Sequence, residues 1–210
     1  MKSPYFLYER YPALTCCKED IEKAAQALKE TFKSGGTIYC CGNGGSAADC
    51  EHIVGELMKG FIRKRPLAQE EQEELRKIDA VDGAYLAEHL QCGLRAVSLM
   101  GQEALSSAVG NDLGGDIAPA QQLLGFARPG DVLLGISTSG NARNIALACK
   151  VAKLKRLKII GMTGEGGGKL ASLADVCIKV PAKETYRVQE YHLPIYHALC
   201  MMIECRYFKA

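Results

Sequence analysis

The feature that most constrains the fold of this chain is a recurring unit of strand, turn and helix. Its clearest copy begins with an apolar strand at residues 37–41, continues into the glycine-rich turn 42–46 and ends in a helix that runs to about Gly60. Helices with alanine-rich faces, such as residues 142–153, separate most of the other strands. Those strands are predicted at residues 96–99, 131–136, 158–162 and 176–180. Alternating helices and strands, with strands that are apolar throughout, indicate an α/β fold whose parallel sheet is covered on both faces.

Three further segments complete the expected organisation. Apolar residues at three- and four-residue spacing predict an amphipathic helix over 17–33. The last helix, about 186–208, is apolar on more than one face, so we expect it to be buried between subunits. Residues 67–92 begin with an acidic run and fit an inserted helical pair, which could cover the active-site mouth, extend a subunit contact or be a decoration. Residues 1–210 are therefore expected to form one domain with this insertion.

Composition excludes several classes of protein. The 26 basic and 24 acidic residues give a net charge of +2, spread along the chain, so no nucleic-acid partner is expected. No apolar run reaches about 18 residues, and the charged N-terminus does not resemble a signal peptide, so no membrane partner is expected either. The ten cysteines lack Cys-x-x-Cys spacing and are interpreted as reduced core residues, which fits a cytoplasmic protein.

Two polar turns follow the carboxyl ends of predicted strands, where parallel sheets bind ligands. The second turn places three hydroxyls in a row, Ser137, Thr138 and Ser139, at the start of a helix. A helix cap needs only one hydroxyl, so we interpret this turn as a phosphate cradle. The first turn follows the same logic with fewer hydroxyls, and it fits neither a dinucleotide-binding nor a Walker motif. Its candidate residues are Asn43, Gly44, Gly45 and Ser46.

Titratable side chains recur on the helix after the first turn and on the last helix. His52 and Glu56 are four residues apart and share one helical face. Gln189 and His197 are eight residues apart and again share a face. Such groups could hold a zinc ion, or could act as base and acid without a metal. Spacing alone leaves these possibilities open beside that of an ordinary surface pair.

Five motifs together resemble those of the phosphoheptose isomerases, a family of sugar isomerase (SIS) domains. The Ser-Thr-Ser-Gly-Asn turn is typical of SIS domains in general, and the other motifs narrow the resemblance to this family and its close non-catalytic relatives. The resemblance runs over nearly the whole chain apart from residues 67–92. The motifs lie at residues 41–49, 109–112, 131–141, 163–169 and 187–190.

The resemblance implies a flavodoxin-like, three-layer SIS domain with a central parallel sheet and helices at both ends, assembled as a homotetramer with active sites between subunits. It implies Zn²⁺ held by His52, Glu56, Gln189 and His197, with Glu56 as the base at carbon and His197 as the acid and base at oxygen. The implied substrate-binding residues are Asn43, Gly44, Gly45, Ser46, Asn111, Asp112, Ser137, Thr138, Ser139 and Gln189.

The expected reaction converts sedoheptulose 7-phosphate into D-glycero-D-manno-heptose 7-phosphate through an enediol, for nucleotide-activated heptose synthesis. Two positions depart from the family pattern. Ala142 replaces a serine after the phosphate turn, and Tyr186 replaces an aspartate before the last helix. Two alternatives therefore stay open: a non-catalytic SIS protein that binds a sugar phosphate or a replication initiator, and an isomerase of another sugar phosphate.

Overall fold

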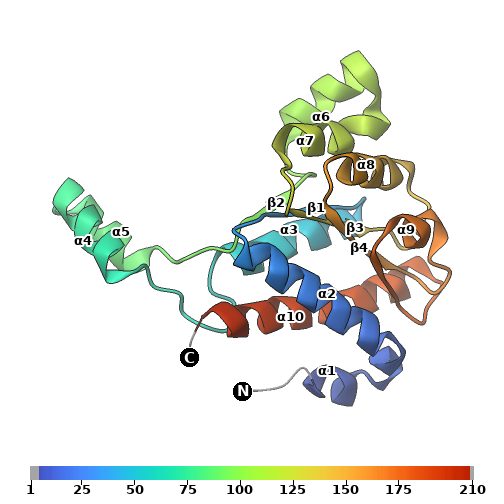
Figure 1. Ribbon diagram of the computed structural model, residues 1–210, viewed down its shortest axis with the longest axis horizontal. Coiled ribbons are helices and arrows are strands. Elements are labelled where there is room, and N and C mark those ends of the chain that lie inside the picture. The colour runs from blue at the N-terminus through green and yellow to red at the C-terminus, as the bar shows by residue number, and fades with distance from the viewer. Residues whose placement is uncertain (1–4, 209–210) are drawn as a thin grey trace.

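The computed structural model describes residues 5–208, and its centre is a five-stranded parallel sheet (Figure 1). Its strands, in the order β2-β1-β3-β4-β5, confirm all five predicted strands to within a residue at most ends. They are β1 (Ile38–Cys41), β2 (Ala96–Ser98), β3 (Val132–Ile136), β4 (Lys158–Thr163) and β5 (Val176–Lys179). This order is that of flavodoxin-like doubly wound sheets, in which ligands bind beyond the carboxyl ends of the strands.

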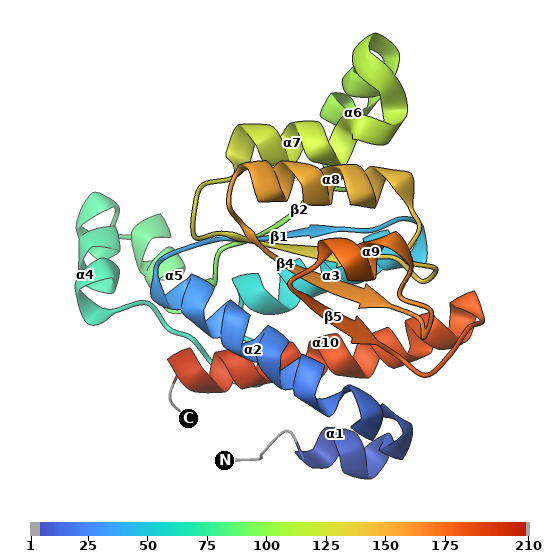
Figure 2. The same ribbon diagram turned by 45° about the vertical axis from the view of Figure 1, so that its right-hand side comes forward.

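The sheet separates two helical layers, because successive side chains of a strand point to opposite faces. In β1, Ile38 and Cys40 face one layer whereas Tyr39 and Cys41 face the other. Figure 2 shows α2 and α10 on one side of the sheet and α7 and α8 on the other. The first layer is formed by α2 (Lys18–Lys33), α3 (Gly45–Met58) and α10 (Thr185–Tyr207), and the second by α7 (Ala118–Phe126), α8 (Arg143–Leu154) and α9 (Gly168–Leu173). The predicted three-layer α/β fold is confirmed.

Further short helices lie before α2 and between β2 and α7. Before α2 lie α1 (Tyr5–Arg10) and the 3₁₀ helix η1 (Pro12–Cys17). Between β2 and α7 lie α6 (Glu103–Val109), the π-helical turn η2 (Gly110–Gly114) and the 3₁₀ turn η3 (Gly115–Ile117). Among residues 5–208 there is no helix whose length and apolar character would allow it to cross a bilayer.

The apolar C-terminal helix is largely buried within its own subunit. Ile195, Leu199 and Ile203 of α10 belong to the core cluster that also holds Ala24 of α2 and Ile53 of α3. Because α2 and α3 cover the core face of α10, its apolar composition is explained within one subunit, and the expected burial of this helix between subunits stays a prediction. Its composition alone no longer argues for a subunit contact.

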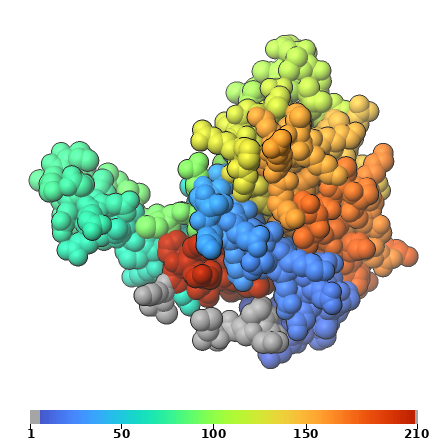
Figure 3. All heavy atoms as spheres, viewed as in Figure 1, coloured from blue at the N-terminus to red at the C-terminus, as the bar shows by residue number. Residues whose placement is uncertain are grey.

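Residues 67–92, called the arm below, contain two helices, α4 (Gln69–Ile78) and α5 (Asp82–His89), as the acidic and helical pattern predicted. The arm projects from the body of the molecule in Figure 1, and the space-filling view of Figure 3 shows it standing apart from the body. Its neck is an isolated antiparallel bridge between Pro66 and Gln91, next to a hydrogen bond of 2.7 Å from the Cys92 N–H to the Arg65 carbonyl.

Candidate active site

The two polar turns lie side by side because β1 and β3 are neighbours in the sheet. Cys41, the last residue of β1, is paired with Gly135 of β3, so both strands deliver their turns to the same edge. The amides of Asn43 and Asn144 exchange two hydrogen bonds, of 2.9 and 2.7 Å, which tie the first turn to the start of α8. The structure therefore brings together the two turns that the sequence singled out.

The second turn uses its own hydroxyls to fix its shape. Ser137 Oγ accepts the Ala142 N–H at 3.4 Å, and Ser139 Oγ accepts the Asn141 N–H at 3.2 Å. The Ser137 N–H donates to the carbonyl of Met162 at 3.0 Å. Within the described part of the chain, no hydrogen bond engages the N–H groups of Thr138 and Ser139. Those two donors, in the turn that precedes α8, are the kind that binds a phosphate.

The loop after β4 is hydrogen-bonded to the backbone of this turn, a role that the sequence motif at 163–169 did not reveal. The Gly164 N–H donates to the Thr138 carbonyl, and the Leu170 N–H donates to the Gly140 carbonyl, both at 2.9 Å. Gly140 has a φ of 68°, and a Cβ there would overlap the carbonyl of Gly167. Glycine is required at Gly140 for both its left-handed backbone and this close approach.

Titratable side chains from α3 and α10 meet in one cluster. His52 Nε2 lies 3.1 Å from Glu56 Oε1 and 3.5 Å from His197 Nε2. His52 and Glu56 are one turn apart on α3, whereas His197 is 145 residues from His52 in the chain. The packing of α10 against α3 is thus what places His197 beside the other two.

Sequence reasoning missed two members of this cluster, Asp49 and Tyr196. The Tyr196 hydroxyl donates to Asp49 Oδ1 at 3.2 Å and lies 3.0 Å from His52 Nδ1. When Tyr196 gives its only proton to Asp49, its hydroxyl oxygen accepts a hydrogen bond from the Nδ1–H of His52. Their positions carried a usable signal, because Asp49 precedes His52 by one helical turn and Tyr196 precedes His197 directly.

The surroundings shift the protonation of several of these groups. Burial raises the pKa of Asp49, an effect that the hydrogen bond from Tyr196 opposes. Burial also raises the pKa of Tyr196, and the neighbouring Asp49 adds to this rise. For His197, burial lowers the pKa first and the charge of His52 lowers it further, while Glu56 acts in the opposite direction. Tyr196 therefore stays protonated, and His197 favours its neutral form.

The other predicted site residues occupy different surroundings. Gln189 lies against the start of α3, where a Cβ at Gly45 would overlap its side-chain amide. Asn111 and Asp112 are exposed in η2, where the Asn111 amide donates to Asp112 Oδ1 at 2.7 Å, and no described contact brings them to either turn. In residues 5–208, no three His, Cys, Asp or Glu side chains form a ready-made metal site.

The fold and these turns define a class of protein, and comparison with known proteins identifies it. Two family models, both described as SIS domain, match residues 13–73 and 114–203. A phosphoheptose isomerase of Akkermansia muciniphila is 35% identical over 196 residues, which are 93% of this chain and 90% of that protein.

Two solved structures are also similar. The phosphoheptose isomerase of Neisseria gonorrhoeae has a TM-score of 0.69 at 34% identity and covers 88% of this chain and 86% of its own. That of Francisella tularensis has a TM-score of 0.73 at 27% identity, covering 98% of this chain and 100% of its own. The chain belongs to the phosphoheptose isomerase family of SIS-domain proteins, and it is an isomerase.

Proposed function

We propose that this protein is an aldose–ketose isomerase that converts sedoheptulose 7-phosphate into D-glycero-D-manno-heptose 7-phosphate. Its membership of the family supports a phosphorylated sugar as substrate. One structural observation carries the proposal: a carboxylate and an imidazole from helices far apart in the sequence, Glu56 and His197, both lie within 3.5 Å of His52 Nε2. An isomerisation needs such an acid–base pair in addition to a phosphate-binding turn.

The substrate phosphate binds at the two turns in this proposal. The free N–H groups of Thr138 and Ser139, the helix start behind them and the hydroxyls of the 137–139 turn supply donors to it. Ser46, which is buried in the first turn of α3, contributes a further hydroxyl. Binding energy from this remote group fixes the reacting carbons relative to the acid–base pair.

The reaction moves a proton between C1 and C2 through a cis-enediol, so one group must act at carbon and another at oxygen. Glu56 is the base at carbon. Among the described residues no group donates a hydrogen bond to its buried Oε2, which forms an ion pair with Lys59 Nζ at 3.6 Å and keeps a lone pair for a proton. His197 exchanges the proton at oxygen, for which its preference for the neutral form suits it as an acceptor.

We include a zinc ion in the proposal, supported by two separations within the cluster. Two ligands about 2.0–2.1 Å from a tetrahedral zinc lie about 3.3 Å apart. The separations of His52 Nε2 from Glu56 Oε1 and from His197 Nε2, 3.1 and 3.5 Å, bracket that value. His52, Glu56 and His197 would hold the ion with Gln189 as fourth ligand, and bound zinc would polarise the substrate oxygens. As both ligand and base, Glu56 would have to loosen from the ion during turnover.

The test is an assay of the purified protein with sedoheptulose 7-phosphate, with detection of an aldose product. Glu56→Gln keeps the shape of the side chain but removes the base, so kcat should fall by about 10²- to 10⁴-fold with phosphate binding retained. Ser137→Ala with Ser139→Ala should instead raise KM, with a loss of roughly 2–4 kcal/mol of binding. Glu51→Gln, an exposed neighbour on α3, is the matched control.

Three outcomes would contradict this proposal at different points. A parent protein that binds the sugar phosphate without converting it would indicate a non-catalytic SIS protein. Nearly full activity in Glu56→Gln would place the base elsewhere. For zinc, the metal content of the purified protein and its affinity for added Zn²⁺ should both fall in His197→Gln, and equal content in parent and variant would exclude this ligand set.

Two departures from the family pattern bear on the choice of sugar. Ala142 forms the N-cap of α8 without a side-chain hydrogen bond, and Tyr186 is exposed at the start of α10. Hexose phosphates therefore belong in the same assay, and faster conversion of one of them would replace the heptose in this proposal. The cytoplasmic location and the homotetramer implied by the family stay predictions.

A further inference from the structure

The arm presents apolar side chains that nothing else in residues 5–208 covers. Ile78, Val81 and Tyr85 are 80%, 77% and 61% exposed, and Leu86 and Leu90 are exposed beside them. The helices α4 and α5 pack on each other and make no comparable contact with the body. Large exposed apolar patches are rare on monomeric proteins and mark surfaces that bind a partner.

The arm is nevertheless built as a fixed element. At the neck, Gln91 Oε1 accepts the N–H groups of Gly60 and Arg65, at 3.0 and 3.3 Å. At the tip, Asp79 Oδ1 accepts the N–H groups of Val81 and Asp82, at 2.8 and 2.6 Å, which caps α5. Helices of ten and eight residues are marginal in water without tertiary packing, so these bonds hold the arm in shape for a contact.

The arm is also the acidic pole of the molecule. Residues 67–92 contain seven acidic and two basic residues, a net charge of −5, whereas the whole chain carries +2. The rest of the chain therefore carries +7. A partner surface for the arm must be apolar and basic, and the body of this same chain carries such a surface.

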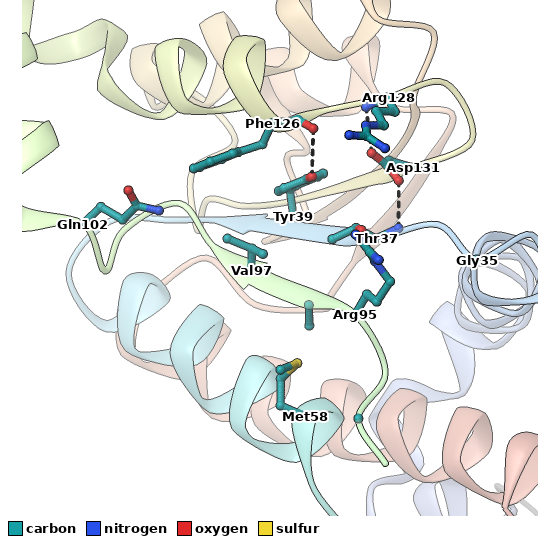
Figure 4. A pocket seen from close by; sticks show the side chains of 12 residues that line it. Gly35, Thr37, Tyr39, Met58, Arg95, Val97, Gln102, Phe126, Arg128 and Asp131 are labelled. Atoms are coloured by element: carbon teal, nitrogen blue, oxygen red, sulfur yellow. Dashed lines mark hydrogen bonds between the residues drawn. The ribbon is translucent and has the colours of Figure 1, made fainter. Parts of the chain in front are cut away.

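A cavity of about 730 Å³ lies at the amino ends of β1, β2 and β3, at the end of the sheet opposite to the two polar turns (Figure 4). Apolar side chains line it, among them Met58 and Phe126, which are 49% and 43% exposed. Arg95 and Arg128 add two positive charges. The one acidic residue of the lining, Asp131, has both oxygens engaged by N–H groups, those of Thr37 at 2.8 Å and Arg128 at 2.7 Å.

We propose that the arm of one copy docks into this cavity of a second copy, and that the exchange is reciprocal. Both halves of the complementary pair, an acidic apolar hairpin and a basic apolar cavity, belong to one chain and are uncovered. Met58 and Gly93 line the cavity and lie within two residues of Gly60 and Cys92 at the neck. A two-fold axis near the neck therefore lets both arms engage at once, which closes the assembly. The inference does not depend on the proposed reaction.

The absence of tryptophan from the chain gives a direct test. Tyr85→Trp places a single tryptophan on the arm, and its emission should shift to the blue as protein concentration rises and the arm becomes buried. Arg95→Glu with Arg128→Glu, called the cavity variant, should abolish that shift. Lys23→Glu with Lys183→Glu makes the same change in net charge at exposed sites outside the cavity and should leave the shift intact. Leu154→Trp, at an exposed residue at the end of α8, should give an emission that does not change with protein concentration.

A mixing experiment separates a second copy from every other occupant. The cavity variant carrying Tyr85→Trp should emit to the red when alone. A second chain, with residues 68–90 replaced by a Gly-Ser bridge, keeps the cavity and Gln91 but has no arm. Adding it should restore the blue shift, because the arm of one chain meets the intact cavity of the other. The proposal would be overturned if the emission changed neither with protein concentration nor on addition of the armless chain. It would also be overturned if the emission of the cavity variant alone were already shifted to the blue.

Discussion

His192 is fully buried in α10, and neither of its ring nitrogens has a hydrogen-bond partner among the described residues. Burial lowers the pKa of His192 to about 4, because a charged imidazole loses its hydration there, and the nearby backbone of Thr163 opposes this shift only in part. In the unfolded chain the same group has a pKa near 6.5. Between these two values the unfolded state binds the proton and the folded state does not, so folding stability must rise with pH in that window.

The resulting prediction concerns stability alone. Lowering the pH from 7 to 5 should cost about 2 kcal/mol of the free energy of unfolding through this residue. His192→Gln removes the titration, so its urea-unfolding curves at the two pH values should differ by correspondingly less than those of the parent. His89→Gln, at an exposed histidine of the arm, should keep the pH dependence of the parent. An unchanged pH dependence in His192→Gln would refute this role of burial.

At the scale of single residues, the sequence was most informative for residues that directly follow the carboxyl end of a strand. The 137–139 hydroxyls and the 42–46 turn follow directly from the positions of two strands, and the structure places them side by side. Asp49 and Tyr196 were missed because their role depends on how α3 packs against α10. Helical spacing gives the face of one helix, but not which residue of a distant helix it meets.

The contact between α3 and α10 is fixed at one end by an ion pair whose partners are both 0% exposed, Arg65 and Glu204. Arg65 Nη2 lies 2.8 Å from Glu204 Oε1, and its other N–H groups donate to the carbonyls of Leu57 and Glu56 at 2.6 and 3.1 Å. Glu204 also accepts the Phe61 N–H at 2.8 Å. The pair thus ties the C-terminal end of α3, which carries Glu56, to the C-terminal half of α10.

Breaking this pair from one side should be costly. Arg65→Met leaves the carboxylate of Glu204 buried without its counter-charge, so the free energy of unfolding should fall by about 3–5 kcal/mol. Arg65→Met combined with Glu204→Leu removes both charges and should recover part of that loss, as measured by urea unfolding of all three proteins. Lys64→Met changes the exposed neighbour and should stay within about 0.5 kcal/mol of the parent. A loss below about 1 kcal/mol in Arg65→Met would contradict the account.

At the scale of elements, periodicity was sufficient for the strands, for α2 and α8, and for the two helices of the arm. The surroundings of each element were harder to predict. The apolar pattern of α10 was interpreted as a subunit contact, although α2 and α3 bury its core face within the chain. Hydrophobic periodicity indicates that one face of a helix is buried. It does not indicate whether the residues that bury this face belong to the same chain.

At the scale of the whole molecule, the three layers follow from the apolar character of both strand faces. The position of the arm does not, because its own pattern of apolar and acidic residues is the same whether it folds back or projects. Buried cysteines are present in both helical layers. Cys17, Cys50 and Cys200 lie in the layer of α2, α3 and α10, whereas Cys41 and Cys149 lie in the other layer.

These thiols predict how the molecule unfolds. All ten cysteines are free; six are buried, and Cys16 is exposed. Burial raises the pKa of Cys17, Cys149 and Cys200 to about 12, so in the folded protein they are neither accessible nor ionised. At pH 8, a thiol reagent followed by peptide mass spectrometry should modify Cys16 rapidly, and Cys16→Ser should lose only that phase. Because one sheet joins the two layers, the buried thiols of both should react at one common slow rate, that of global unfolding. Faster reaction of Cys41 and Cys149 than of Cys50 and Cys200 would show instead that the layer of α7 and α8 opens separately.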